Sequence, residues 1–241
     1  MSLKNNYTTN DILAIAEYNH WWFQSRRAIM EYIFWKKLTK KDLKILSVGC
    51  DTGAELEHLS YFGRVTGIDI DPEAILFCRL KGFEVIQSDV LASNLKKESF
   101  DIIVAMDVIE HIQDDVKAIS ALKNLLKKDG KLLITVPALP CLWSSFDEEG
   151  DYPHFRRYTK KTLTNLFRMQ NLIIEKISYY NFFLFPLALI ARLSNQSFAS
   201  QMNSSNKFKN TLLRSIFSFE KYFLSWMSFP TGVSLVAVCR K

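Results

Sequence analysis

The sequence predicts an α/β fold in which helices cover both faces of a mainly parallel sheet. Three observations support this fold class. Strand-like and helix-like segments alternate between residues 44 and 136, a glycine-bearing turn joins the first strand to its helix, and residues 100–106 form a nearly continuous apolar run typical of a strand buried on both faces. At 241 residues, of which 48% are hydrophobic, the chain is long enough for one large domain.

The segment KILSVGCDTGAELEHLSYFGRVTGID, residues 44–69, has the pattern strand, glycine turn, helix and second strand. The turn contains Gly49 and Gly53, and Asp69 follows Gly49 by 20 positions at the end of the second strand. Free N–H groups at such a turn can bind a ligand, and the acidic residue can accept hydrogen bonds from both hydroxyls of a ribose. The unit therefore predicts a nucleoside site at the carboxyl edge of the sheet. The alternative is an ordinary βαβ turn without a ligand.

The remaining elements divide one domain, residues 1–241, into four parts. A leading helical lid is expected over residues 8–38, the core over residues 44–180, an apolar and basic insertion over residues 181–229, and the last strand over residues 230–241. Within the core, helices are expected at residues 72–81, 114–126 and 159–167, and strands at residues 83–87, 100–106, 131–136 and 172–178. Residues 138–158 leave the carboxyl edge of the sheet and can form a wall of the site.

The charge is distributed unevenly. Residues 151–241 carry 13 Lys or Arg and only 3 Asp or Glu, whereas the first 150 residues carry 18 and 22. The basic part also contains residues 211–227, whose apolar side chains fall on one helical face. This helix can pack on the core, pair with a second copy in a homodimer, or make peripheral contact with a membrane or an apolar substrate. A solvated basic surface without a partner is the alternative for the charge.

Four cysteines lie far apart, without a CxxC pair and without histidines at metal-ligand spacing, so neither a disulfide framework nor a metal site is expected. The start of the chain lacks the apolar core of a signal peptide. The longest apolar run, residues 182–191, is too short to span a bilayer. These features predict a cytoplasmic location.

With these segments placed, the chain resembles the class I S-adenosylmethionine-dependent methyltransferases over nearly its whole length. Five pieces occur in the family's order: SVGCDTG, VTGIDID, QSDV, FDIIVAMDVIEHI and LKKDGKLLITVPA. The segments HWWFQSRR, LWSSFDEEGDYPHFRRYT and FPTGVSLVAV resemble one bacterial branch of the family. The resemblance implies a Rossmann-like sheet of seven strands, mostly parallel, with one antiparallel strand near the edge. It also implies methyl transfer from S-adenosylmethionine.

The resemblance further implies cofactor contacts at the carboxyl edge. The glycine loop would hold the methionine part, Asp69 the ribose, the segment after the third strand the adenine, and the end of the fourth strand the transferred methyl group. Arg26 or Arg27 is the candidate for the cofactor carboxylate. The implied cofactor-binding residues are Arg27, Gly49, Cys50, Asp51, Gly53, Asp69, Ile70, Ser88, Asp89, Val90, Asp107 and Val108.

Two positions depart from the family pattern. Ser47 stands where the family usually has an acidic residue, and Asp51 stands where it usually has glycine. The carboxylate of Asp51 can supply the charge that Ser47 lacks, and aspartate tolerates the left-handed backbone better than most residues. The alternatives are a noncatalytic partner protein that keeps the fold and a dinucleotide-dependent oxidoreductase. The latter would be expected to have G-x-G-x-x-G, and the loop here is G-x-x-x-G.

Methyl transfer needs a general base only where the acceptor must lose a proton. His111 and His154 are the candidates for this catalytic role, since one follows the fourth strand and the other lies in the irregular wall; each can instead be a packing or surface residue. Arg156 and Arg157 can bind an anionic acceptor or pair with nearby carboxylates and fix the loop. The basic, aromatic C-terminal part favours a small-molecule or lipid-linked, amphiphilic acceptor, and no nucleic-acid motif is present.

Overall fold

The computed structural model describes residues 17–38, 42–148, 152–193 and 207–241. Its centre is a seven-stranded sheet in the order β3-β2-β1-β4-β5-β7-β6. Neighbouring strands from β3 to β5 pair in parallel, whereas β7 runs antiparallel to both β5 and β6. The strands are β1 (Leu43–Val48), β2 (Gly63–Asp69), β3 (Val85–Gln87), β4 (Phe100–Met106), β5 (Leu126–Pro137), β6 (Ile173–Tyr180) and β7 (Ser234–Arg240). The predicted seven-stranded, mostly parallel fold is confirmed.

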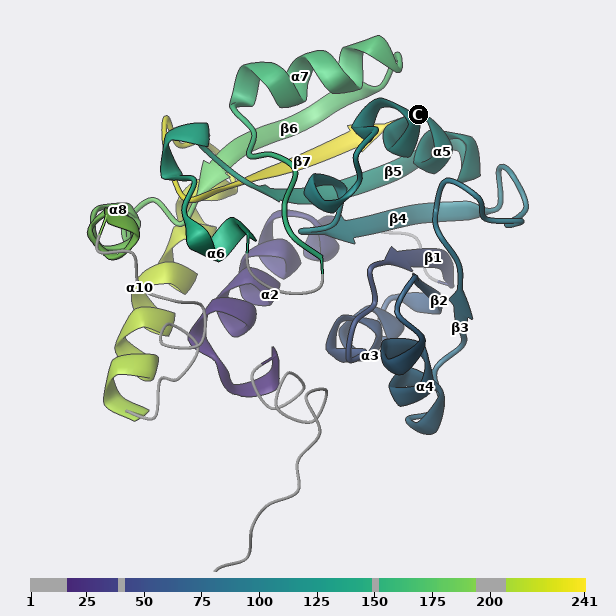
Figure 1. Cartoon of the computed structure of the whole chain (residues 1–241), viewed down its shortest axis with the longest axis horizontal. Helices are drawn as coiled ribbons and strands as arrows, with labels where there is room; N and C mark the ends of the chain where they lie inside the picture. Colours follow the sequence, from purple (N-terminus) through teal and green to yellow (C-terminus); the bar gives the residue numbers. More distant parts are fainter. Residues whose placement is uncertain (1–16, 39–41, 149–151, 194–206) are drawn as a thin grey trace, which may run out of the picture.

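Helices cover both faces of this sheet (Figure 1). Helices α5 and α7 lie on one face, and α2, α3, α4 and α10 lie on the other. The helices are α2 (Trp21–Ile33), α3 (Ala54–Ser60), α4 (Pro72–Leu80), α5 (Asp115–Leu125), α6 (Ser145–Glu148), α7 (Lys160–Met169), α8 (Phe185–Leu193) and α10 (Lys207–Leu224). Short 3₁₀ helices occupy η1 (Trp35–Lys37), η2 (Ile109–His111) and η3 (Pro140–Leu142). The core between the layers is apolar, and β4 and β5 contribute an almost unbroken series of buried residues.

Local sequence signals account for several helix boundaries. Pro72 occupies the first turn of α4, and the side chain of Asp71 accepts a hydrogen bond from the N–H of Glu73. The expected cap at Thr159 is also present, because the side chains of Thr159 and Thr162 each accept a hydrogen bond from the other residue's backbone N–H. These contacts satisfy N–H groups that the helix itself leaves unpaired.

The single leading helix expected over residues 8–38 is wrong within the described residues. His20 has an extended backbone, with φ −75° and ψ 137°, and its side chain accepts a hydrogen bond from the N–H of Trp22 at the start of α2. This cap ends the short helical piece at residues 17–19 and starts a new helix at Trp21. Residues 8–16 of that prediction lie outside the described residues.

Four further boundaries differ from expectation. Strand β3 is shorter than residues 83–87, and β7 begins at Ser234 rather than at residue 230. Strand β5 begins at Leu126 instead of residue 131, because Leu126 pairs with Phe100 before a shift in register. Helix α10 spans Lys207–Leu224 and not residues 211–227, since the N–H groups of Trp226 and Met227 both bond to the carbonyl of Phe223 and close the last turn.

Two further findings concern membrane-spanning helices and the cysteines. Within the described ranges, no helix combines the length and the apolar character needed to cross a membrane. The four cysteines, Cys50, Cys78, Cys141 and Cys239, are free thiols.

Candidate functional site

The glycine loop between β1 and α3 has an unusual backbone. Gly49, Asp51 and Gly53 all have positive φ, at 69°, 42° and 83°. A Cβ atom at Gly49 would lie 2.6 Å from Cγ2 of Val108, so only glycine allows the loop to approach the end of β4 this closely. The loop is therefore held against the residue that follows Asp107, as expected if both contact one ligand.

Asp69 lies directly beside the glycine loop. One oxygen of its carboxylate accepts a hydrogen bond from the N–H of Asp51 at 3.0 Å, and the other accepts from the N–H of Asp71 at 3.0 Å. These bonds fix the carboxylate at the end of β2, and each oxygen keeps a further lone pair for a ligand hydroxyl. The structure thus brings together the two features that predicted a nucleoside site.

Asp107 follows β4 with φ 56° and forms the centre of a buried polar cluster. Nη1 of Arg26 lies 2.5 Å from Oδ2 of Asp107, and the hydroxyl of Thr135 donates to Oδ1 at 3.1 Å. Burial by itself would lower the pKa of Arg26, but the nearby Asp107 carboxylate, with smaller contributions from other groups, raises it overall. Arg26 is therefore a permanent positive charge at the carboxyl edge of the sheet.

Arg27 points elsewhere. Its guanidinium donates a hydrogen bond to the carbonyl of Glu17 at 2.6 Å and lines an open hollow with His58, Arg214 and Lys221. Burial, and the positive charge of Arg26, lower the pKa of Arg27. Of the two arginines considered from the sequence, the structure places Arg26 beside the glycine loop and Asp107, and a cofactor contact by Arg27 stays a prediction.

Glu17 is a residue of the site that sequence reasoning missed. Its side chain is buried and accepts a hydrogen bond from the hydroxyl of Thr52, inside the glycine loop. Burial raises the pKa of Glu17, and the Thr52 hydrogen bond and Arg26 oppose that rise. The loop that lacks an acidic residue at Ser47 therefore receives a carboxylate from the N-terminal segment. No motif marks Glu17, because the break at His20 decides where this side chain points.

Asp51, expected to replace the missing charge, is an exposed residue of the same loop. Desolvation by the loop, followed by repulsion from the carboxylates of Glu17, Asp69 and Asp71, raises the pKa of Asp51 to about 7. Two carboxylates, those of Glu17 and Asp51, thus lie near the loop.

The predicted adenine side of the site is built by the ends of β2 and β3. The N–H of Ser88 bonds to the carbonyl of Asp69 at 2.9 Å, which holds the two strand ends together. Ile70 is half exposed and Asp89 is exposed, whereas Val90 and Cys50 are buried. Val90 and Cys50 can therefore contact a ligand only through their backbone, as expected for the Val90 amide.

The two predicted catalytic histidines lie side by side. The ring centroids of His111 and His154 are 4.6 Å apart, although η2 carries the first and the irregular segment after β5 carries the second. Burial, and then the neighbouring His154, lower the pKa of His111. The fully buried Glu110 precedes His111, and burial raises its pKa well above the usual range.

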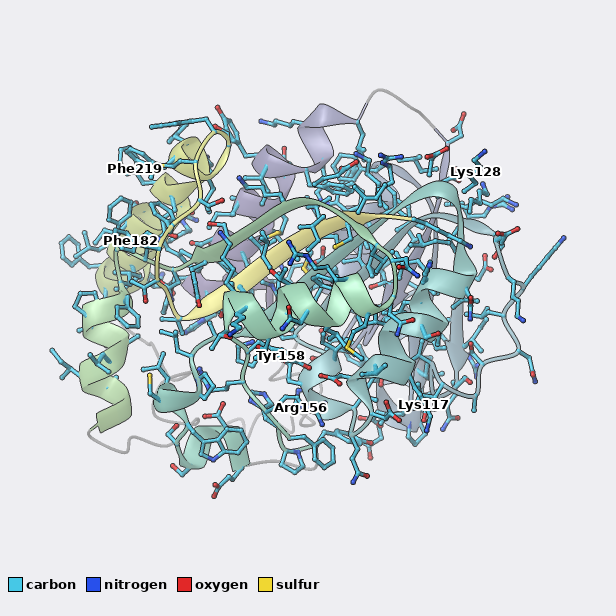
Figure 2. All side chains as sticks on the ribbon, turned by 90° about the horizontal axis from the view of Figure 1, so that it is seen from above. Lys117, Lys128, Arg156, Tyr158, Phe182 and Phe219 are labelled. Atoms are coloured by element: carbon cyan, nitrogen blue, oxygen red, sulfur yellow. The ribbon has the colours of Figure 1, made fainter. Side chains whose placement is uncertain are left out.

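The arginines of the irregular segment are engaged in contacts within the protein. Nε of Arg157 lies 2.8 Å from Asp147, and its Nη1 donates to the carbonyl of Ala138 at 2.7 Å. Arg156 pairs with Asp115, which also accepts a hydrogen bond from Tyr158. Figure 2 shows Arg156 and Tyr158 below α7. These contacts favour the interpretation that the arginines fix the segment over that of an anion site.

The sequence model of the methyltransferase domain family matches residues 46–134. This part of the chain is therefore similar to a methyltransferase domain. The match begins within β1 and ends within β5, and so includes the glycine loop, Asp69 and Asp107. The fold implied by the five sequence motifs is confirmed.

Curated relatives match a part of the chain. Ubiquinone biosynthesis O-methyltransferase of Xanthomonas oryzae is 34% identical over 100 residues, which are 38% of this chain and 42% of the relative. The enzyme of the same name from Xylella fastidiosa is 34% identical over 116 residues, 44% of this chain and 46% of the relative. The chain thus spans less than half the length of the curated relatives that it matches.

Solved structures are similar over a larger part of the chain. A methyltransferase of Archaeoglobus fulgidus matches with a TM-score of 0.60 at 16% identity, covering 95% of this chain and 99% of its own. Phosphoethanolamine N-methyltransferase 2 of Haemonchus contortus, solved with S-adenosylmethionine, matches with a TM-score of 0.63 at 21% identity. The match covers 99% of this chain and 58% of that enzyme. At these identities the similarity shows the fold alone.

Proposed function

We propose that the protein transfers the methyl group of S-adenosylmethionine to a hydroxyl of a small, apolar or amphiphilic acceptor. The observation that supports the cofactor most directly is the left-handed glycine loop, which lies against Val108 and donates its Asp51 N–H to Asp69. The cofactor offers a ribose diol, an adenine and a charged methionine part. The loop and its neighbours supply a partner of suitable chemistry for each.

The residues present fit this cofactor. Asp69 accepts from the ribose hydroxyls, and Ile70 covers one face of the adenine while Ser88, Asp89 and the Val90 amide meet its edge. The loop has room for close approach of the methionine part because Gly49 and Gly53 carry no side chain. The carboxylates of Glu17 and Asp51 attract the methionine ammonium, and the Arg26 guanidinium attracts its carboxylate.

The bound cofactor supplies an electrophilic methyl group, so the protein mainly has to align the acceptor and exclude water. Asp107 and Val108 stand where the methyl group is expected, and the Arg26 and Thr135 contacts fix Asp107 in place. His111 and His154 lie on the acceptor side as general bases, one of which removes the hydroxyl proton. The low pKa of His111 keeps its imidazole neutral and able to accept that proton at pH 7.

The acceptor side is aromatic and exposed. Large apolar side chains project into solvent from α8 and α10 and the turn after α10: Leu187, Ile190, Phe208, Leu212, Phe219, Tyr222 and Trp226. Figure 2 shows Phe219 and Phe182 together at one end of the molecule, far from Lys128 at the other end. An amphiphilic acceptor, such as a phenol with a long apolar chain, would bury part of this face. The names of the curated relatives also favour O-methylation of such a molecule.

Calorimetric titration with S-adenosylhomocysteine tests the cofactor, with NAD as a control ligand. We expect micromolar binding of S-adenosylhomocysteine alone, and affinity at least about 10-fold lower in Asp69→Asn, which loses the charge that faces the ribose. Asp42→Asn changes an exposed aspartate of positive φ before β1 and should leave the affinity unchanged. Binding of neither ligand would refute the proposal and support the noncatalytic alternative, whereas NAD binding would support an oxidoreductase.

A comparison of phenols with and without a long alkyl chain tests the acceptor class. Methyl transfer from radiolabelled cofactor should favour the alkylated phenol, and Phe219→Ser with Trp226→Ser should weaken that preference. Tyr61→Ser removes an aromatic side chain that is 80% exposed at the C-terminal end of α3 and serves as the matched control. Equal turnover of both phenols by the parent protein would contradict an amphiphilic acceptor.

A further inference from the structure

Three potential metal ligands from distant parts of the sequence meet beside the carboxyl end of β4. Glu110 and His111 belong to η2, and His154 follows His111 by 43 positions in the segment between β5 and α7. One ligand atom from each of these residues lies within 4.8 Å of those of the other two. This separation is small enough for a single cation to contact all three after minor adjustment of the side chains.

The carboxylate of Glu110 is attracted by the charges of Arg157 and Arg26 but forms no direct contact with either among the described residues. The side chain is completely buried, and neither oxygen has a hydrogen-bond partner among the described residues. A buried carboxyl group without a partner is costly, and a bound cation would remove that cost. The cluster combines two histidine rings with one carboxylate, and such a combination is found in metal sites.

The two histidines are held as metal-binding histidines usually are. Nδ1 of His154 lies 2.8 Å from Oδ1 of Asp147, and Nδ1 of His111 lies 3.3 Å from the carbonyl of Pro153. Each contact is with an oxygen that can accept a hydrogen bond but cannot donate one. In both histidines Nδ1 is therefore the protonated nitrogen, and Nε2 keeps its lone pair. Carboxylate and carbonyl partners of this kind orient the ligating histidines of metal sites.

The partner of His154 is itself fixed. Arg157 donates to the same Asp147 carboxylate at 2.8 Å, and the N–H of Ser144 donates to its other oxygen at 3.0 Å. The carboxylate, the imidazole and the expected cation would then form a carboxylate–histidine–metal series. The ion pair between Arg157 and Asp147 would thus orient His154 as a metal ligand, in addition to fixing the loop.

We propose that Glu110, His111 and His154 bind a divalent transition-metal cation, with Zn²⁺ as the first candidate. Two imidazoles and one carboxylate are a ligand set of catalytic zinc sites, which leave a position open for water or substrate. Mg²⁺ prefers oxygen ligands, so the two nitrogen donors argue against it. The cysteine spacing that spoke against a metal in the sequence has no bearing on this site, since no cysteine takes part.

The role of the cation in catalysis rests on the proposed function. The binding of the cation to these three residues does not. With the cation bound, His111 and His154 would act as ligands in place of the general-base role, and an acceptor hydroxyl in the open position would release its proton to water more readily. Its oxygen would form the new bond to the methyl carbon while the carbon–sulfur bond of the cofactor breaks. The site would thereby select acceptors that have a hydroxyl group.

Titration with Zn²⁺ after chelator treatment and without cofactor tests the site. We expect one equivalent to bind in the parent protein and affinity at least about 100-fold lower in His154→Asn. Asparagine can keep the hydrogen bond to Asp147 and lacks a group at the Nε2 position. His58→Asn removes a histidine of α3 outside the cluster and should bind Zn²⁺ like the parent. Equal binding in His154→Asn, or none in the parent, would overturn the inference.

The coordination can be examined with Co²⁺, whose visible absorption reports on its ligands. Intense bands in the parent that are lost in Glu110→Gln and His154→Asn would support the three ligands, and a spectrum of hydrated Co²⁺ in the parent would refute them. If Glu110→Gln does not fold, His154→Asn decides the result, because its side chain is partly exposed. Binding of Zn²⁺ without binding of S-adenosylhomocysteine would refute the proposed function and support the metal site. Binding of S-adenosylhomocysteine without binding of Zn²⁺ would support the proposed cofactor and refute the metal site.

Discussion

The two halves of the sheet are built differently. From β3 to β4 every neighbouring pair is parallel, the connections are short, and carboxylates gather at the carboxyl edge. From β5 to β6 the strands are antiparallel, an irregular segment and two insertion helices interrupt the alternation, and aromatic side chains reach the surface. The first half contains the residues that we propose for the cofactor, whereas the second contains the exposed aromatic residues that we propose for the acceptor.

The similarity to known proteins follows this division. The family match ends at Ile134, near the point where the parallel part stops. The curated relatives likewise match only 100 to 116 residues. The cofactor proposal therefore depends mainly on residues inside the family match, whereas the acceptor proposal depends on residues beyond Ile134.

Gly49→Ala, in the parallel half of the sheet, should have the largest effect on cofactor affinity and stability. The new Cβ would clash with Val108 at 2.6 Å on a left-handed backbone. We expect S-adenosylhomocysteine affinity to fall at least about 100-fold and the free energy of unfolding to fall by about 3–4 kcal/mol. Gly82→Ala is the control, because Gly82 also has positive φ but a Cβ there meets open space. Calorimetry and urea unfolding measure both effects, and unchanged affinity in Gly49→Ala would contradict the assignment of the loop.

Arg26→Met tests whether the leading helix stabilises the cofactor half. It leaves the Asp107 carboxylate, whose side chain is 28% exposed, without its ion-pair partner. We expect a loss of about 2–3 kcal/mol in the free energy of unfolding, less than for a fully buried pair. Lys127→Met, at the other end of β4, removes a lysine that is 35% exposed from its pair with Asp101, which keeps the hydrogen bond from the N–H of Lys44, and should cost about 1 kcal/mol or less. Equal losses in urea unfolding would show that the Arg26 pair has no special role.

Glu220→Gln should stabilise the acceptor half in a pH-dependent way. Burial raises the pKa of Glu220 from 4.5 to about 7, so its contribution to stability is complete below pH 4.5 and is lost as the pH rises through 7. Glutamine keeps the oxygen that accepts from the N–H of Phe183. We expect a gain of about 2 kcal/mol at pH 8 and little change at pH 4.5.

Thermal unfolding at the two pH values measures this effect. Glu84→Gln, at an exposed position before β3, serves as the control and should change stability by less than about 0.5 kcal/mol at either pH. A gain of the same size at both pH values would show that ionisation of Glu220 is not the cause.

Asp51→Asn should have the smallest effect and refines the account of the glycine loop. The pKa of Asp51 near 7 means that its carboxylate is mostly protonated at pH 6 and ionised at pH 8. We expect S-adenosylhomocysteine affinity in the parent to rise by up to about 10-fold over this range and to stay level in Asp51→Asn. If Asp51→Gly binds the cofactor as tightly as the parent, Asp51 does not compensate for Ser47, and Glu17 provides the charge alone.

The sequence by itself determined the features that depend on neighbours along the chain. The apolar run at Phe100–Met106 predicted β4 with the observed bounds, and Pro72 and Thr159 predicted two helix starts. The glycines and Asp69 predicted a turn and a strand end that the structure places together. Each of these follows from periodicity, capping or backbone freedom, which act over a few residues.

Only the tertiary structure decided which side chains meet. Adjacent arginines at positions 26 and 27 point to different places, and Glu17 reaches the loop because the chain breaks at His20. The cluster of Glu110, His111 and His154 forms because the segment after β5 returns over the end of β4. Such contacts depend on helix breaks and on the packing of segments far apart in sequence, and no local pattern records them.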